Sequence, residues 1–229
     1  LTRNFNYRNQ NVRLYEIGKI YLPGGEDGLA HESRMLTLGA YGENMDFFAI
    51  KGAVEAILRD IRAKNVTFEP FKNDPSYHPG RCASVFADGA LLGVVGQIHP
   101  NVARNYGVDA ELYCAELNMT ALFAAQGDDV QYTPLPKYPA VTRDIAVVCK
   151  RTITVGELTE CIRKAGGKLL RGVELFDIYQ GKGIAEDSKS VAFSLTIRSD
   201  ERNIVAAEAD EEVQTILDAL KNELGAVLR

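Results

Sequence analysis

The sequence lacks any long apolar run. Nowhere in its 229 residues is there an uninterrupted hydrophobic stretch of about 20 residues, the length that a membrane-spanning helix needs. The opening stretch from Leu1 is polar and basic, without the apolar centre of a secretory signal. We therefore expect a soluble protein with no membrane contact, and we expect the segment to continue upstream.

The sequence also has few cysteines and fewer basic than acidic residues. The four cysteines show no paired short spacing of the kind that disulfide frameworks or zinc sites have, which predicts reduced core thiols and a cytoplasmic location. Lysine and arginine number 26 against 31 acidic residues, a net charge of −5. This excludes a surface coated with basic residues for non-specific nucleic-acid binding, so we expect no DNA partner and only local contact with RNA.

Motifs for metal binding or catalysis are missing as well. His31, His78 and His99 have no spacing that fits a helix pair or a zinc knuckle, so we predict no metal site. The glycine-lysine-glycine run at 181–183 lacks the spacing of a phosphate-binding loop and is more typical of a hairpin loop. We predict no catalytic residue in this chain.

The first half of the chain predicts an antiparallel sheet with one long helix. Apolar residues recur every three or four positions over 46–63, which places them on one helix face. Asp88 and Gly89 separate two apolar runs and predict a tight hairpin turn. The expected strands are 12–21, 35–41, 66–71, 81–86, 91–98 and 111–117.

A boundary follows at 126–137, where prolines interrupt the pattern and little apolar periodicity remains. Beyond it, Thr154 and Glu157 have the spacing of a capping box that begins a helix ending near Lys164. The remaining expected elements are strands at 145–149, 169–179, 190–198 and 227–228 and a helix at 207–224. This order is that of a ferredoxin-like split β-α-β unit, within an α+β chain divided as 1–125, 126–137 and 138–229.

The predicted sheet of the second domain has one face without helices. Along 190–198 apolar residues alternate strictly with small and polar ones, so the second set should point away from the helices. On neighbouring strands the same alternation points Phe176 and Ile178 toward the helices. The residues expected on the open side include Ala146, Asp177, Tyr179 and Ser190.

This open side suits a flat heterocyclic ring. Tyr179 can stack on a base, and Asp177 can accept hydrogen bonds from an edge with N–H and NH₂ groups, such as that of guanine. The helix from Glu208 to Glu223 holds six acids and one lysine, which leads us to expect a mildly positive sheet side. A polar sheet face that is simply solvated, or covered by another domain or partner, remains the alternative.

Several motifs in register resemble one known family. The runs at 137–146, 174–181 and 189–195 are similar to the ferredoxin-fold anticodon-binding domain of the bacterial-type phenylalanyl-tRNA synthetase β subunit. The runs at 12–21, 46–52, 78–80 and 92–100 resemble the class II synthetase-like, catalytic-like domain of the same subunit, in the same order. The resemblance covers nearly the whole chain.

This resemblance implies roles for particular residues. It implies that Asp177 and Tyr179 hold the first anticodon base of tRNA(Phe), a guanine, above Ala146, with Ser190 as a further polar contact. Class II synthetases bind ATP with an arginine two residues before a motif glutamate, but here Leu14 precedes Glu16. The third-motif region, 113–122, contains no arginine either.

The family resemblance also implies partners. The first domain is expected to be non-catalytic and to scaffold a catalytic α subunit in an α2β2 heterotetramer. That partner would use ATP and magnesium to make phenylalanyl-adenylate and then phenylalanyl-tRNA. No cofactor is expected in this chain itself. A module that binds only protein, without RNA contact, stays open as the alternative.

Overall fold

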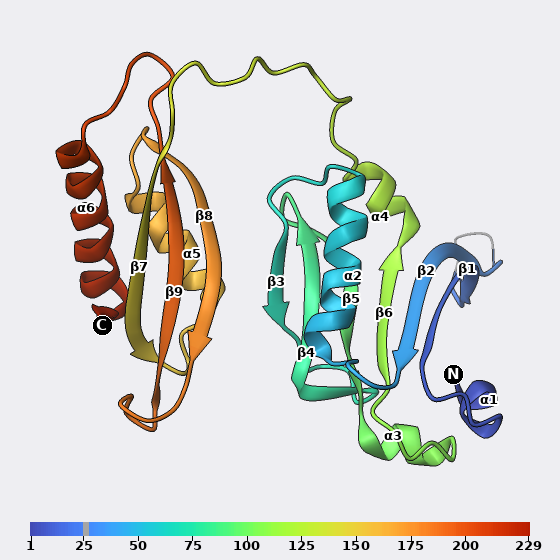
Figure 1. Ribbon diagram of the computed structural model, residues 1–229. Coiled ribbons are helices and arrows are strands. Elements are labelled where there is room, and N and C mark those ends of the chain that lie inside the picture. The colour runs from blue at the N-terminus through green and yellow to red at the C-terminus, as the bar shows by residue number, and fades with distance from the viewer. Residues whose placement is uncertain (25–27) are drawn as a thin grey trace. The chain divides into compact units, whose positions relative to one another are not determined.

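The computed structural model describes residues 1–24 and 28–229, and these form two compact units, Leu1–Gln131 and Tyr132–Arg229. The division falls inside the proline-containing segment 126–137 (Figure 1). Each unit has its own sheet and its own hydrophobic core. We describe the two units separately.

Unit 1 is built on a six-stranded antiparallel sheet in the order β1-β2-β6-β5-β4-β3. Asp88 and Gly89 both have positive φ, +47° and +77°, and form the predicted hairpin turn between β4 and β5. The strands are β1 (Val12–Leu22), β2 (His31–Tyr41), β3 (Thr67–Pro70), β4 (Tyr77–Ala87), β5 (Ala90–Ile98) and β6 (Tyr113–Asn118). The helices are α1 (Thr2–Asn6), α2 (Phe47–Asp60), α3 (Pro100–Asn105) and α4 (Met119–Ala124).

Helices α2 and α4 cover one face of this sheet. Asp46 begins α2, because its side chain accepts a hydrogen bond from the Ala49 amide at 2.7 Å. The predicted apolar stripe then buries Ile50, Val54 and Leu58 against the strands. The opposite side of the sheet, which we call the far face, has a smaller apolar cluster near α3 and carries neither α2 nor α4.

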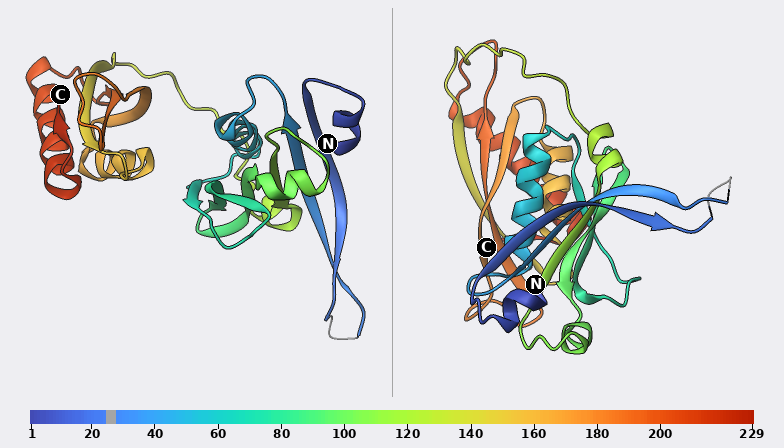
Figure 2. Two further views of the ribbon diagram at one scale, coloured as in Figure 1. Left: turned by 90° about the horizontal axis from the view of Figure 1, so that it is seen from below. Right: turned by 90° about the vertical axis from the view of Figure 1, so that its right-hand side faces the viewer.

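Strands β1 and β2 extend beyond their neighbours. Strand β6 pairs only with the part of β2 from Met35 to Ala40, whereas β1 pairs with β2 from Tyr41 to His31. The result is a two-stranded projection, the β1–β2 arm, which reaches away from the body of the unit in the right-hand view of Figure 2. Along its whole length, in the arm and beside the body of the sheet, the edge strand β1 exposes several apolar residues: Leu14, Tyr15, Ile17, Ile20, Tyr21 and Leu22.

Unit 2 has the predicted ferredoxin-like topology. Its antiparallel sheet has the order β10-β7-β9-β8, and helices α5 and α6 share one core with it. In Figure 1, α5 is seen behind the strands and α6 beside β7. The elements are β7 (Val141–Lys150), α5 (Val155–Ala165), β8 (Leu170–Tyr179), β9 (Ser188–Ile197), α6 (Ala206–Leu224) and β10 (Val227–Leu228). The α+β fold predicted from the sequence is confirmed.

Local signals in unit 2 act as the sequence predicts. The Glu157 amide donates to the Thr154 hydroxyl at 3.2 Å, and the Thr154 amide donates to the Glu157 carboxylate at 2.6 Å. This capping box begins α5. Gly225 ends α6 with φ of +62°, a conformation that glycine adopts without steric cost.

One prediction about β8 is wrong. Phe176 does not point into the core but is 56 % exposed. Leu175 pairs with Phe193 and Asp177 pairs with Ala192, so Phe176 is the extra residue of a β-bulge on an edge strand. Ile178 lies on the helix side as predicted, because it pairs with the buried Val191, yet it stays 44 % exposed at the sheet edge.

Candidate functional site: the open face of unit 2

The sheet of unit 2 turns one side away from α5 and α6, and we call this side the open face. Strand β9 shows the alternation clearly, because its helix-side residues are fully buried. Ser194 and Thr196 alternate with them and are partly exposed. The helix-side set is Val191, Phe193, Leu195 and Ile197.

Strand register brings the four predicted site residues into two adjacent rows across the open face. In the first row Ala192 of β9 lies between Ala146 of β7 and Asp177 of β8. In the second row, Ser190 lies between Val148 and Tyr179. Directly opposed residues on neighbouring strands are about 5 Å apart, so all four belong to one surface. The bulge at Phe176 does not disturb these pairings, because it precedes Asp177.

Tyr179 is held in place from two sides. Its hydroxyl donates to the Lys182 carbonyl at 3.2 Å, which ties the ring to the following loop. The guanidinium carbon of Arg229 lies 5.3 Å from the ring centroid, within range of a cation–π interaction. The Arg229 amide in turn donates to the Ala146 carbonyl at 2.9 Å, which positions this arginine beside the first row.

Arg229 was not among the residues predicted for this face. The alternation of side chains along a strand could have predicted its place. A short last strand was expected at 227–228, and the residue after it points to the side opposite that of Leu228. Val227 pairs with Val148, an open-face position, so Arg229 two residues later returns to the same side. A guanidinium there can stack on a base or contact a phosphate.

Two groups in these rows have unused hydrogen-bonding capacity. Ser190 is only 3 % exposed, and its hydroxyl has no hydrogen-bond partner among the described residues. It is less accessible than the sequence predicted, because small residues and the Tyr179 strand surround it. The Asp177 side chain is exposed and likewise pairs with none of the residues in 1–24 and 28–229. An acceptor, a hydroxyl and an aromatic ring therefore remain available to a ligand.

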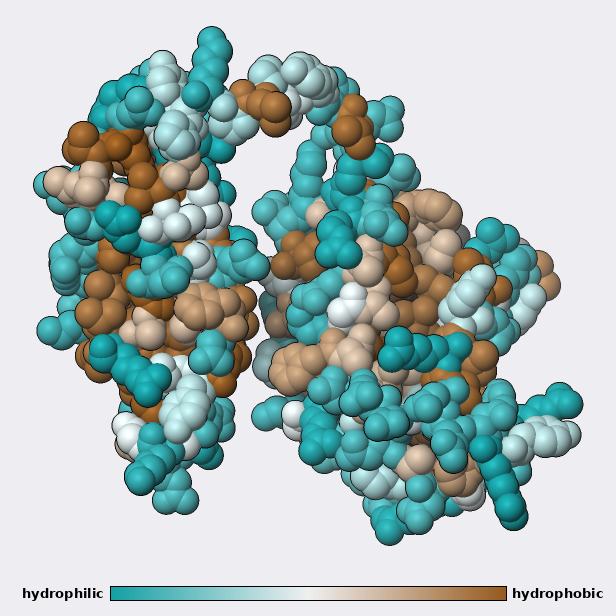
Figure 3. Space-filling model, in the orientation of Figure 1, coloured by the Kyte–Doolittle hydropathy of each residue, from teal (hydrophilic) through white to brown (hydrophobic). Residues whose placement is uncertain are grey.

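The charge of the open face differs from the expected mild excess of positive charge. Asp144 and Glu174 flank Ser194 in the row next to Asp177, so the middle of the face carries three carboxylates. Arginines lie toward its ends, with Arg229 at one end and Arg198 at the other. In Figure 3, brown, tan and white residues lie among teal ones on the visible side of this unit. The net charge of a chain segment could not predict this distribution, because the charge of the open face depends on which side chains of each strand point to that face.

The far face of unit 1 lacks the cations of a nucleotide site. One row contains Glu16, Thr37 and Glu116, and the next contains Leu14, Gly39 and Cys114. None of the far-face positions described for β1, β2 and β6 is lysine or arginine. An ATP triphosphate does not fit a surface with two carboxylates and no positive charge.

The thiols on the same face are unreactive. Burial raises the pKa of Cys82 to about 11 and, with the Glu116 carboxylate adding to the effect, also raises the pKa of Cys114 to about 11. Both therefore stay protonated at neutral pH and are weak nucleophiles. Neither an activated nucleophile nor a phosphate-binding cation is present among these residues.

Two of the three histidines, His78 and His99, serve local structure. The Nδ1 atoms of His78 and His99 each accept a backbone hydrogen bond, from Gly80 and Asn101, at 3.1 Å. The two rings stack with centroids 6.4 Å apart. Over the described parts of the chain, no group of three or more His, Cys, Asp or Glu side chains is arranged to hold a metal ion.

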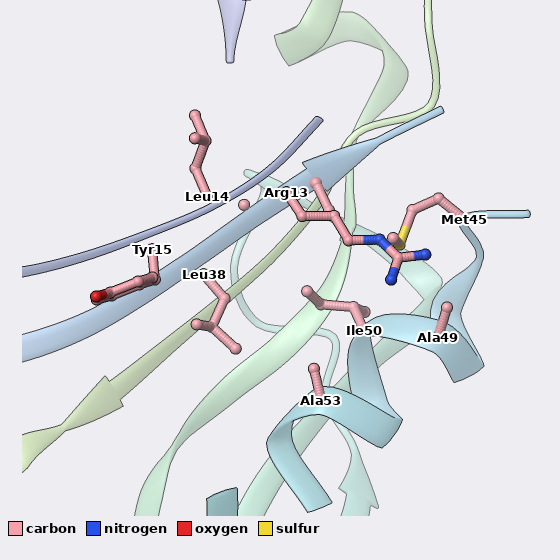
Figure 4. Close-up of a pocket in the computed structure, with 10 residues that line it drawn as sticks. Arg13, Leu14, Tyr15, Leu38, Met45, Ala49, Ile50 and Ala53 are labelled. Atoms are coloured by element: carbon pink, nitrogen blue, oxygen red, sulfur yellow. The ribbon is translucent and has the colours of Figure 1, made fainter. Parts of the chain in front are cut away.

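An apolar groove lies where the base of the β1–β2 pair faces α2. Its cavity volume is about 230 Å³, and Leu38 and Ile50 form its floor, with Arg13 reaching across toward Met45 (Figure 4). Tyr15 and Ile17 continue the apolar surface outward along β1 and are 75 % and 53 % exposed. The groove is lined by Arg13, Leu14, Tyr15, Leu38, Gly39, Ala40, Met45, Ala49, Ile50 and Ala53.

Fold and site together define a class of protein. A sheet domain without catalytic cations precedes a ferredoxin-fold domain whose open face presents a ring, a carboxylate and a hydroxyl. Residues 1–119 match the family described as the phenylalanyl tRNA synthetase beta chain CLM domain, and residues 136–229 match the ferredoxin-fold anticodon binding domain. The chain belongs to the phenylalanyl-tRNA synthetase β chain family.

Curated relatives agree with this assignment. The chain is 37 % identical to the phenylalanine–tRNA ligase beta subunit of Clostridium tetani, over 100 % of its own length and 29 % of the relative. It is 36 % identical to the corresponding subunit of Bacillus subtilis, over 99 % of its length and 29 % of the relative. The chain thus spans less than a third of these relatives. Among the described helices, none is both long enough and apolar enough to cross a membrane.

Proposed function

We propose that this chain is the RNA-binding and scaffolding part of a phenylalanine–tRNA ligase β subunit, and that unit 2 binds the first anticodon base of tRNA(Phe). The observation that carries the proposal is the meeting of Tyr179, Asp177 and Ser190 in two adjacent rows. Each offers a different interaction: stacking, acceptance of two hydrogen bonds, and a hydroxyl without a partner in the described chain. Guanine suits this set, because its N1–H and N2–H₂ groups form a double donor edge.

The stacking contribution can be measured with an RNA stem-loop that carries the anticodon GAA. Tyr179→Ala is expected to weaken binding by roughly 1 to 3 kcal/mol, or about 5-fold to 150-fold in Kd, because the stacking surface is lost. Tyr179→Phe keeps the ring and removes only the hydrogen bond to the Lys182 carbonyl, so its affinity should stay close to that of the wild type. Fluorescence anisotropy of the labelled stem-loop gives all three dissociation constants. Equal affinity in wild type and Tyr179→Ala would contradict stacking on this ring.

A second role rests on unit 1. Tyr15 and Ile17 of β1 are exposed on the same side of the sheet as the groove beside α2, and together they form an apolar surface of the kind that protein partners cover. We assign this surface to the catalytic α subunit, which would bring ATP and magnesium in an α2β2 assembly in the cytoplasm. The far face, with its two glutamates, supports a scaffold and not a second ATP site.

The scaffold assignment predicts a position-specific loss of assembly. Ile17→Asp places a charge on the exposed edge strand β1 and is expected to weaken association with the α subunit at least about 10-fold, since a buried contact there would have to desolvate a carboxylate. Leu91→Asp, at an exposed position beside the β4–β5 turn, is the matched control and should associate normally. Analytical ultracentrifugation of the mixed subunits measures both. Phenylalanine-dependent ATP–pyrophosphate exchange by the chain alone, or equal association of both variants, would contradict the assignment.

The same stem-loop and variants distinguish the RNA-binding proposal from the alternative of a module that binds only protein. It predicts no binding of the GAA stem-loop by unit 2 and no effect of Tyr179→Ala on any RNA. Ser190 favours the RNA-binding role, because this residue is almost enclosed in the sheet face while its hydroxyl has no hydrogen-bond partner in the described chain and so is available to a ligand.

A further inference from the structure

The end of the open face away from Tyr179 carries a pair of arginines. Arg198 follows β9 directly, and its amide still donates to the Leu169 carbonyl at 2.8 Å, so the extended alternation continues and turns its side chain to the open side. Arg171 is the extra residue of a second bulge in β8, between Leu170 and Gly172. Its Nε donates to the Arg198 carbonyl at 3.4 Å, which holds the two residues together.

These two arginines share one counterion. Asp200 accepts from Arg171 Nη2 at 2.6 Å and lies 3.5 Å from Arg198 Nη2. With two guanidinium groups and one carboxylate, the cluster keeps a net positive charge. The side chains of Arg171, Arg198 and Asp200 are 39 %, 25 % and 59 % exposed, so an anion can reach this cluster from solvent.

Arg198 also has a donor without an acceptor. Its Nε is the one buried side-chain nitrogen or oxygen in the described residues that has no hydrogen-bond partner. Buried donors are normally paired, because removal from water without a replacement partner costs free energy. Because Nε itself is closed to solvent, an anionic oxygen would meet the exposed part of the Arg198 side chain, where both guanidinium groups attract it.

The rest of the open face explains why an anion would bind at this end. Asp144 and Glu174 flank Ser194 between the arginine pair and the Tyr179 rows, and neither forms an ion pair within the described chain. These carboxylates repel phosphates from the middle of the face but can accept from base amino groups. From Ser190 to Arg198 the strand runs about 26 Å, a distance that a few nucleotides of extended single strand can cover.

We infer that Arg198 and Arg171 form a phosphate-binding site for the RNA backbone a few nucleotides away from the base held at Tyr179. This inference rests on the proposed function of unit 2. It assigns Arg198 and Arg171 to positioning of the strand and leaves recognition of the base to Asp177. A phosphate contact changes the salt dependence of binding without changing base preference, which separates the two roles.

The test is the salt dependence of GAA stem-loop binding by the full chain between about 50 and 200 mM salt. Arg198→Gln is expected to lower the slope of log K against log salt by about 0.7, the value for one phosphate contact on a single strand, with the preference for guanine over adenine unchanged. Arg171→Gln should act in the same direction. Arg163→Gln, an exposed arginine on helix α5, is the matched control and should keep the wild-type slope.

Asp200→Asn is expected to bind the stem-loop more tightly, a result that misfolding cannot produce. It removes the competing carboxylate and should tighten binding, most strongly at low salt. An unchanged slope in Arg198→Gln, or weaker binding by Asp200→Asn, would overturn the phosphate site while Tyr179-dependent binding by the wild type still stood. If the wild type binds no stem-loop at any salt concentration, both the proposed function and the phosphate site are wrong.

Discussion

Replacing Asp177 by asparagine is expected to abolish the preference of the chain for guanine at the first anticodon position. The carboxylate can accept from both guanine N1–H and N2–H₂, whereas the asparagine amide offers one acceptor and turns a donor toward a donor. Hydrogen bonds to a charged group contribute roughly 1.5 to 3 kcal/mol, so affinity for a GAA stem-loop should fall about 10-fold to 150-fold. Affinity for an AAA stem-loop should change little.

Glu174→Gln is the matched control for this substitution. Glu174 lies on the same strand and the same face, in the row next to Asp177, and its substitution removes the same charge. Titration of both stem-loops against the two variants measures the guanine-to-adenine affinity ratio. A ratio that falls equally in both variants would mean that the general charge of the face, and not Asp177, sets the preference.

Phe193→Ala is expected to destabilise unit 2 by about 3 to 5 kcal/mol, through loss of buried apolar surface and the cavity left behind. Phe193 is fully buried, and its strand partners Ile145 and Leu175 flank it in the centre of the sheet. Since the core of unit 1 is a separate cluster, the unfolding transition of unit 1 should not move. Hydrogen exchange at increasing denaturant concentration gives the free energy of unfolding of each unit separately, in the wild type and in the variant.

Phe176→Ala tests the bulge with the same change of side chain. Because Phe176 is 56 % exposed, its truncation should cost much less than that of Phe193. Comparable losses in the two variants would mean that Phe176 is packed in the core, as strict alternation along β8 predicts, and would contradict the bulge.

The elements of both sheets were predictable because each rests on a local signal. Alternation along β9, the helical stripe of α2 and the capping box at Thr154 all depend on residues close in sequence. The bulge at Phe176 was not predictable in this way, because it depends on which residue of β9 opposes each residue of an edge strand.

The site was predicted in part for a similar reason. Alternation and family resemblance selected Asp177 and Tyr179, and the register places them in adjacent rows. The burial of Ser190, the approach of Arg229 to the Tyr179 ring and the central carboxylates depend on neighbours brought together by folding. The roles of these residues in RNA binding stay predictions until binding is measured.

The most direct test of the proposed function is the affinity of the wild-type chain for two anticodon stem-loops, GAA and AAA, measured at one salt concentration. Recognition by Asp177 and Tyr179 predicts that the GAA stem-loop binds about 10-fold or more tightly than the AAA stem-loop. Equal affinity for the two stem-loops, or no binding of either, would contradict it.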